Sequence, residues 1–109
     1  MSFAPLQKEV DDWISQFEEG YFPPLNMLAR LTEEVGELAR AVMHEHGGKK
    51  PKSGEAHGAI GEEIADSIFV LICMANAQGI NLDDAFAAMM AKYRLRDASR
   101  WTRKKPLTP

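Results

Sequence analysis

Two short acidic motifs hold the residues of this chain that are best suited to chemistry. The first, EEVGE, spans residues 33–37, and the second, EEIAD, spans residues 62–66. Residues three positions apart are neighbours on a helix surface, so a helix through either motif would carry a pair of carboxylates on one face. Two such faces brought together would offer the oxygen ligands that hard divalent cations prefer. The paired carboxylates are Glu34 with Glu37, and Glu63 with Asp66.

The segment around the first motif has the pattern of an amphipathic helix. Glu33 and Glu37 lie opposite its apolar stripe at about 100° per residue, and Glu34 lies at the flank of that stripe. Taken alone, this motif has the pattern of a solvated outer face. The stripe consists of Leu28, Leu31, Thr32, Val35, Leu38, Ala39 and Val42.

The segment around the second motif is apolar on two sides, which is typical of a buried helix. We therefore expect Glu63 and Asp66 to point into protein. Two unit charges ~5 Å apart repel by roughly 3 kcal/mol at an effective dielectric of ~20, so a bound cation explains inward carboxylates best. Protonation would also relieve the repulsion, but it gives no reason for the matched spacing. One side carries Ile64, Ile68, Leu71, Ile72 and Ala75, and the other carries Glu63, Asp66, Val70, Cys73, Met74 and Ala77.

Apolar periodicity, proline and glycine predict four helices and no strand. We expect helices from about Leu6 to near Gly20, from Pro24 to His46, from Ala59 to Gln78, and from Leu82 to Asp97 or Arg100. The predicted fold class is an all-α, four-helix bundle. Because four helices of one chain bury only one stripe each, the doubly apolar third helix predicts completion by a second copy, with the carboxylates near the subunit boundary.

The length of 109 residues predicts a single domain over 1–109, with a basic, partly flexible tail at about 101–109. The segment 47–58 reads as a loop whose lysines (Lys49, Lys50 and Lys52) could contact phosphate oxygens. Cationic residues also gather at the end of the chain, which suits a metal-bound polyphosphate. They are Lys92, Arg94, Arg96, Arg100, Arg103, Lys104 and Lys105.

Composition narrows the class of protein further. A net charge of −3 gives no sign of nucleic-acid binding or of attachment to a membrane surface. The single cysteine, Cys73, excludes an intramolecular disulfide and reads as a small buried hydrophobe. The chain shows no secretory signal, and its apolar run at 68–75 is too short to cross a bilayer. We expect a cytoplasmic protein.

The two acidic motifs and their spacing resemble those of the MazG-like nucleotide pyrophosphohydrolases, in the all-α NTP pyrophosphatase superfamily. The leading helix with Trp13, the Phe22-Pro23 connector and the order of helices are also similar. The resemblance implies a Mg²⁺-dependent enzyme, with Mn²⁺ as a substitute, that converts a nucleoside triphosphate to the monophosphate and pyrophosphate. It implies dimers or dimers of dimers. It implies metal ligands at Glu34, Glu37, Glu63 and Asp66, with Glu33 as a further catalytic residue of the motif.

The resemblance also suggests substrate contacts. Many members carry a lysine and an asparagine or arginine early in the last helix; here the sequence 92–96 is KYRLR, so Lys92 is carried over and Arg96 is a looser match. Trp13, Tyr21, Phe22 and Asn26 are candidates to contact the base, although each aromatic residue also reads as core. In the implied reaction, water attacks the α phosphorus, and Lys92 and Arg96 help to meet the charge of the leaving pyrophosphate.

Three other interpretations remain. A di-iron carboxylate bundle needs Glu-x-x-His motifs, and neither acidic motif has a histidine at that place. A non-catalytic helical interaction module would bind no Mg²⁺ and release no pyrophosphate. Within the same superfamily, a phosphoribosyl-ATP pyrophosphohydrolase would use more basic loop residues than this sequence shows.

Overall fold

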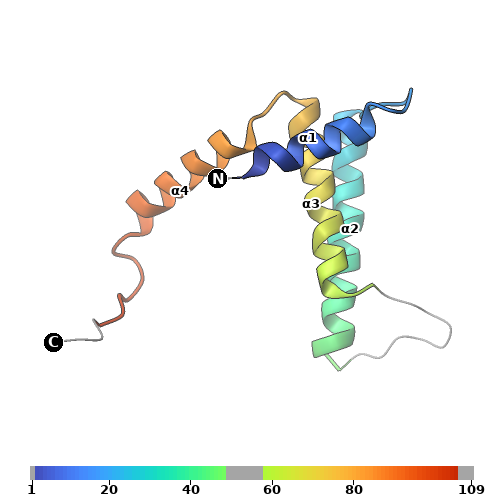
Figure 1. Cartoon of the computed structure of the whole chain (residues 1–109). Coiled ribbons are helices and arrows are strands. Elements are labelled where there is room, and N and C mark those ends of the chain that lie inside the picture. Colours follow the sequence, from blue (N-terminus) through green and yellow to red (C-terminus); the bar gives the residue numbers. More distant parts are fainter. Residues whose placement is uncertain (1, 49–57, 106–109) are drawn as a thin grey trace.

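The computed structural model describes residues 2–48 and 58–105, and within these ranges the chain forms four helices and no strand. The helices are α1 (Phe3–Ile14), α2 (Pro24–His46), α3 (Ile60–Ala77) and α4 (Leu82–Asp97) (Figure 1). The all-α prediction is therefore confirmed for the described chain. The loop lysines at 49, 50 and 52 and the last four residues of the predicted tail lie outside the described residues.

The first helix ends earlier than the sequence predicts. α1 stops at Ile14, and the chain continues in three-residue turns in which Gln16 N donates to Trp13 O and Phe17 N donates to Ile14 O. Trp13 and Phe17 still pack edge to face, with ring centroids 5.1 Å apart. The predicted helical end near Gly20 was wrong. The apolar spacing continues beyond Ile14 because Phe17, in the turns after the helix, packs on Trp13.

The ends of α2 and α3 follow from proline and glycine. Pro24 occupies the first turn of α2, where its missing N–H costs no intrahelical hydrogen bond. After α3, Gly79 adopts a φ of +67°, which a Cβ would strain. Gly79 N then donates to Asn76 O at 3.1 Å and Ile80 N donates to Ala75 O at 2.8 Å, which closes a Schellman motif.

The core is an antiparallel pair of long helices with a third helix across one end. α2 and α3 make the largest helix contact, and α1 packs on α3 near the end where α2 begins (Figure 1). The face of α2 that meets α3 includes the buried Met27 and Ala41. The matching residues of α3 are buried as well: Val70, Ile72, Cys73 and Ala75.

Part of the apolar stripe predicted on α2 is open in the single chain, while Leu31 and Leu38 of the same stripe are half-buried. Leu28 and Val35 are each 50% exposed, and Val42 is also exposed, because the face of α2 that packs on α3 is the one that carries Met27 and Ala41. α3 likewise leaves Ile64, Ile68 and Leu71 exposed. One chain by itself leaves this side of α3 uncovered, and its covering by a second copy stays a prediction.

α4 leads away from the other helices and has no buried residue (Figure 1). Its start is fixed on α1, where the Asp83 carboxylate accepts from Phe3 N at 2.9 Å and from Ala4 N at 3.2 Å, and Phe86 packs on Phe3. The radius of gyration is 18.5 Å, against about 13 Å for a compact chain of this length. One chain alone therefore does not close a four-helix bundle.

In the described part of the chain, no helix combines the length and the apolar character needed to cross a membrane.

Candidate metal centre

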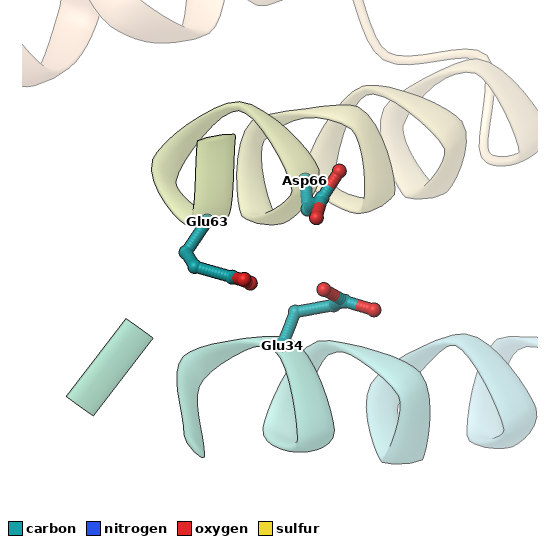
Figure 2. A group of neighbouring side chains, drawn as sticks. All are labelled: Glu34, Glu63 and Asp66. Atoms are coloured by element: carbon teal, nitrogen blue, oxygen red, sulfur yellow. The ribbon is translucent and has the colours of Figure 1, made fainter. Parts of the chain in front are cut away.

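Three carboxylates from two helices converge between α2 and α3. Glu34 points from α2 towards Glu63 and Asp66, which come from the first turns of α3 (Figure 2). One carboxylate oxygen of each residue lies within 4.8 Å of the corresponding atoms of the other two. The structure thus brings together three of the four residues that the sequence predicted as metal ligands.

The helical register explains why these acids meet. Glu34 lies seven residues after Met27 and seven before Ala41, so it occupies the same face of α2 as these buried residues. On α3, Glu63 shares a face with the buried Ser67 and Val70. Packing these two apolar faces together necessarily carries the acids into the same space.

Glu63 is the most deeply placed of the three acids, with 7% of its surface exposed. Its carboxylate sits against Gly58, where a Cβ would overlap Oε1. Burial raises the pKa of Glu63 above its usual range, and the negative charges of Asp66, Glu37, Glu34 and Glu62 raise it further. A group in this environment favours either a proton or a cation beside it.

The other acids of the motifs take different positions. Asp66 is exposed, so the prediction that it points into protein is wrong: it lies at the open edge of the α2–α3 contact, three residues from the buried Glu63. Glu37 is exposed and outside the three-carboxylate group, although its charge acts on Glu63. Glu33 is exposed and lines an open cavity of about 520 Å³ together with Asn26 and Arg30.

Arg30 is a residue at this site that the sequence interpretation missed. Its Nε donates to Glu34 Oε1 at 3.0 Å, and the Glu34 side chain is only 14% exposed. The signal was present in the sequence, because an arginine and a glutamate four positions apart on a helix commonly pair.

The predicted substrate-binding residues are spread over the molecule. Trp13 is 54% exposed on α1 and lines an open cavity of about 630 Å³ with Phe69. Lys92 is exposed on α4, and Arg96 is paired with Asp97 at 3.1 Å and lies over the ring of Tyr93. Both cations are therefore on the helix that leads away from the carboxylates (Figure 1).

Similarity to known proteins agrees with this arrangement. Residues 22–101 match the family model described as the MazG nucleotide pyrophosphohydrolase domain. The chain is 54% identical over 99 residues to the uncharacterized protein YpjD of Bacillus subtilis (strain 168), which covers 91% of this chain and 89% of that protein.

Two solved structures are also similar. The crystal structure of the Bacillus-conserved MazG protein, a nucleotide pyrophosphohydrolase, superposes with a TM-score of 0.74 at 46% identity, covering 96% of this chain and 95% of that one. The putative pyrophosphatase YPJD from Bacillus subtilis gives a TM-score of 0.75 at 49% identity, covering 85% and 95% respectively. The residues that match the family model contain both acidic motifs and helices α2, α3 and α4 of this chain. The resemblance predicted from the sequence is therefore confirmed: this chain belongs to the MazG nucleotide pyrophosphohydrolase family and is an enzyme of the pyrophosphohydrolase class.

Proposed function

We propose that this enzyme hydrolyses a nucleoside triphosphate to the monophosphate and pyrophosphate, with Mg²⁺ held by the carboxylates between α2 and α3. The observation that supports this most is the convergence of Glu34, Glu63 and Asp66. A bundle whose only task was to bind another protein would have no reason to bury a carboxylate beside two others.

The residues present fit a hard divalent cation. Ligand oxygens around Mg²⁺ sit about 2.1 Å from the ion, and hence about 3–4 Å from one another. The three oxygens are within 4.8 Å of one another, so small side-chain rotations would bring them to that spacing. Mg²⁺ keeps several waters and usually takes only a few carboxylates together with substrate phosphates, which suits an open-edged group of three. Mn²⁺ would fit the same oxygen ligands.

The acids of the two motifs have two kinds of task in this proposal: most of them hold the metal ion, and one orients the attacking water. Glu34, Glu63 and Asp66 would hold the ion, and Glu37 would join them by rotating from its exposed position on the same helix. The ion, when bound, would polarise phosphate oxygens and lower the pKa of a water. Glu33, or a ligand carboxylate, would orient the attacking water. That water would form a bond to the α phosphorus and pass a proton to the carboxylate that orients it, while the bond from this phosphorus to the bridging oxygen breaks and pyrophosphate leaves.

We propose further that the working form is at least a homodimer, or a dimer of dimers. The exposed stripes on α2 and α3 and the unburied α4 support this, because together they leave a large apolar area in water. α4 from a second copy would also carry Lys92 and Arg96 to the acidic centre of the first, since in its own chain α4 makes its main contacts with α1. Positive side chains opposite an acidic centre favour such pairing.

Contacts to the nucleoside stay predictions. Asn26 borders the same open cavity as Arg30 and Glu33, which supports a role in hydrogen-bonding a sugar or base. Trp13 lies on α1 beside Phe69, and it would contact a base only if the nucleoside extended across α3.

The test is a panel of ribo- and deoxynucleoside triphosphates assayed for pyrophosphate release with Mg²⁺, with Mn²⁺ and with EDTA. We expect metal-dependent release of pyrophosphate from at least one of them. In water enriched in ¹⁸O, attack at the α phosphorus places the label in the monophosphate. Label in pyrophosphate or in inorganic phosphate would refute this reaction, and a complete lack of turnover would refute nucleoside triphosphates as the substrates. Turnover of phosphoribosyl-ATP alone would assign the alternative activity within the superfamily.

A further inference from the structure

Arg30 links the acidic centre to a partly enclosed cavity in the described chain. Its Nε donates to Glu34, while its side chain is 55% exposed. The same residue lines a cavity of about 90 Å³ between the connector before α2 and the second half of α3. The walls of this cavity are mainly aromatic and aliphatic, and they include Tyr21, Phe22, Met27, Phe69 and Val70.

Relative to the carboxylates, the cavity lies towards one end of the α2–α3 pair. Arg30 lies four residues before Glu34 on α2, and Val70 lies four residues after Asp66 on α3, which is about 6 Å of helix in each case. Because the two helices run antiparallel, both steps lead towards the same end of the pair, where α2 begins and α3 ends (Figure 1). The opposite direction leads to the first turn of α3, which holds Glu62 and Glu63, so an anion there would need the proposed cation beside it.

The positive charge of Arg30 acts both on the acidic centre and on the wall of the cavity. It pairs with Glu34, and it lowers the pKa of the Cys73 thiol in the cavity wall, although burial raises that pKa overall. A guanidinium carries five N–H donors, of which the bond from Nε to Glu34 uses one. The terminal nitrogens are therefore able to bind a phosphate oxygen without releasing Glu34.

We propose that Arg30 binds the α phosphate from the nucleoside side, so that the nucleoside extends towards the aromatic cavity and pyrophosphate leaves towards the first turn of α3. This inference rests on the proposed triphosphate hydrolysis and adds to it the orientation of the substrate. An apolar, aromatic wall suits a base or sugar, whereas pyrophosphate with its several charges would lose hydration there without compensation. Arg30 is then the residue that separates the two products.

The experiment measures the two products separately. Wild type, Arg30→Met and Lys8→Met are titrated by calorimetry with Mn²⁺ alone, and then, at saturating Mn²⁺, with UMP, AMP and pyrophosphate. Lys8→Met is the matched control, because Lys8 forms an exposed pair with Asp12 at the same four-residue spacing on α1. We expect Arg30→Met to weaken monophosphate binding by about tenfold or more, the effect of one charge-assisted hydrogen bond, while Mn²⁺ and pyrophosphate affinities change less than about twofold.

Each other outcome contradicts the orientation. A selective loss of pyrophosphate affinity would place Arg30 on the leaving-group side. Parallel losses for Mn²⁺, monophosphate and pyrophosphate would mean that Arg30 only positions Glu34, and no change at all would make it a solvated ion pair. If Arg30→Met fails to fold, Arg30→Gln keeps a polar but shorter and uncharged side chain for the same titrations. If wild type binds neither product with Mn²⁺, the proposed function itself fails, whatever Arg30 does.

Discussion

Gln7 and Asn76, which are 69 positions apart, exchange two hydrogen bonds of 2.9 Å: Gln7 Nε2 donates to Asn76 Oδ1, and Asn76 Nδ2 donates to Gln7 O. The same pair reaches three further segments. Asn76 Nδ2 also donates to Tyr21 Oη, Gln7 Nε2 donates to Ile80 O, and Gln7 Oε1 accepts from Leu82 N. One amide pair thus joins α1, the connector before α2, the end of α3 and the start of α4.

Asn76→Leu should therefore destabilise the protein more than its partial exposure suggests. The variant removes the hydrogen bonds that Asn76 makes with Gln7 and Tyr21, and each such bond contributes about 0.5–1.5 kcal/mol, although Tyr21 Oη keeps its hydrogen bond to Asp11. Urea denaturation of wild type and variant measures the loss in the free energy of unfolding. Gln78→Leu, at the end of the same helix, is the control, and we expect it to change stability by less than about 0.5 kcal/mol. Equal losses in the free energy of unfolding for the two substitutions would show that the Gln7–Asn76 hydrogen bonds do not contribute measurably to stability.

Asp66→Asn and Glu63→Gln should each lower kcat by about 100-fold or more, because each removes a charged oxygen ligand from the proposed metal site. The melting temperature of the metal-free variants should rise, since repulsion among the acids falls. Turnover with saturating Mg²⁺ and melting in EDTA measure the two effects. Glu18→Gln, an exposed residue beyond α1, serves as the charge-matched control. Near-normal turnover of either variant would rule out its role as a ligand.

Glu37→Gln tests whether the fourth predicted ligand joins the centre. Glu37 is exposed and stands outside the three-carboxylate group, but its charge raises the pKa of Glu63. We expect Mn²⁺ affinity to fall by about 10–100-fold, as for loss of a group that holds or tunes a metal. Paramagnetic titration with Mn²⁺ gives the affinity directly. An unchanged affinity would limit the ligands to Glu34, Glu63 and Asp66.

The stability of the metal-free protein should fall as pH rises above about 4.5, and Glu63 is the cause. Its folded-state pKa is raised above the usual 4.5 by burial and by the neighbouring carboxylates, so the folded protein binds more protons than the unfolded chain between those two values. The free energy of unfolding then decreases with pH across that window and is constant, for this group, below and above it.

Melting temperatures in EDTA from pH 4 to 8 measure this effect. Glu63→Gln should flatten the fall within the window, and adding Mg²⁺ to wild type should restore stability at the upper end. A variant whose melting temperature tracks that of wild type at every pH would mean that another group titrates.

Mixing two inactive variants should restore activity if α4 serves the centre of a second copy. One parent is Asp66→Asn, and the other carries both Lys92→Ala and Arg96→Ala. In a mixed dimer, one site would combine intact acids with intact cations, so co-refolding equal amounts should recover about a quarter of wild-type turnover.

The two variants alone, and a mixture without refolding, are the controls for this experiment. If mixed dimers form, as differently tagged chains would show, but stay inactive, Lys92 and Arg96 act within their own chain or not at all. A monomer in sedimentation analysis would reject the dimer together with the shared site.

The sequence by itself determined the helices and most of their ends. Periodicity, Pro24 and Gly79 are local signals. The N-cap of α4, where Asn81 Oδ1 accepts from Asp84 N at 3.1 Å, is a contact between neighbouring residues as well. The matched spacing of the acids also indicated a shared centre, because the helical repeat alone puts residues three apart on one face. The family likewise followed from local motifs, since both acidic motifs lie within the matched region.

The tertiary structure alone decided which helical faces meet. α3 has two apolar sides, so the periodic pattern allowed more than one pairing with α2. Packing chose the pairing that buries Glu63 and leaves Asp66, Leu28 and Ile68 exposed. α4 shows the same limit: its residues form a helix by local preference, but its direction is set by the Asp83 bonds to the start of α1. Contacts between distant segments depend on shape and burial across the whole chain, and no local spacing records them.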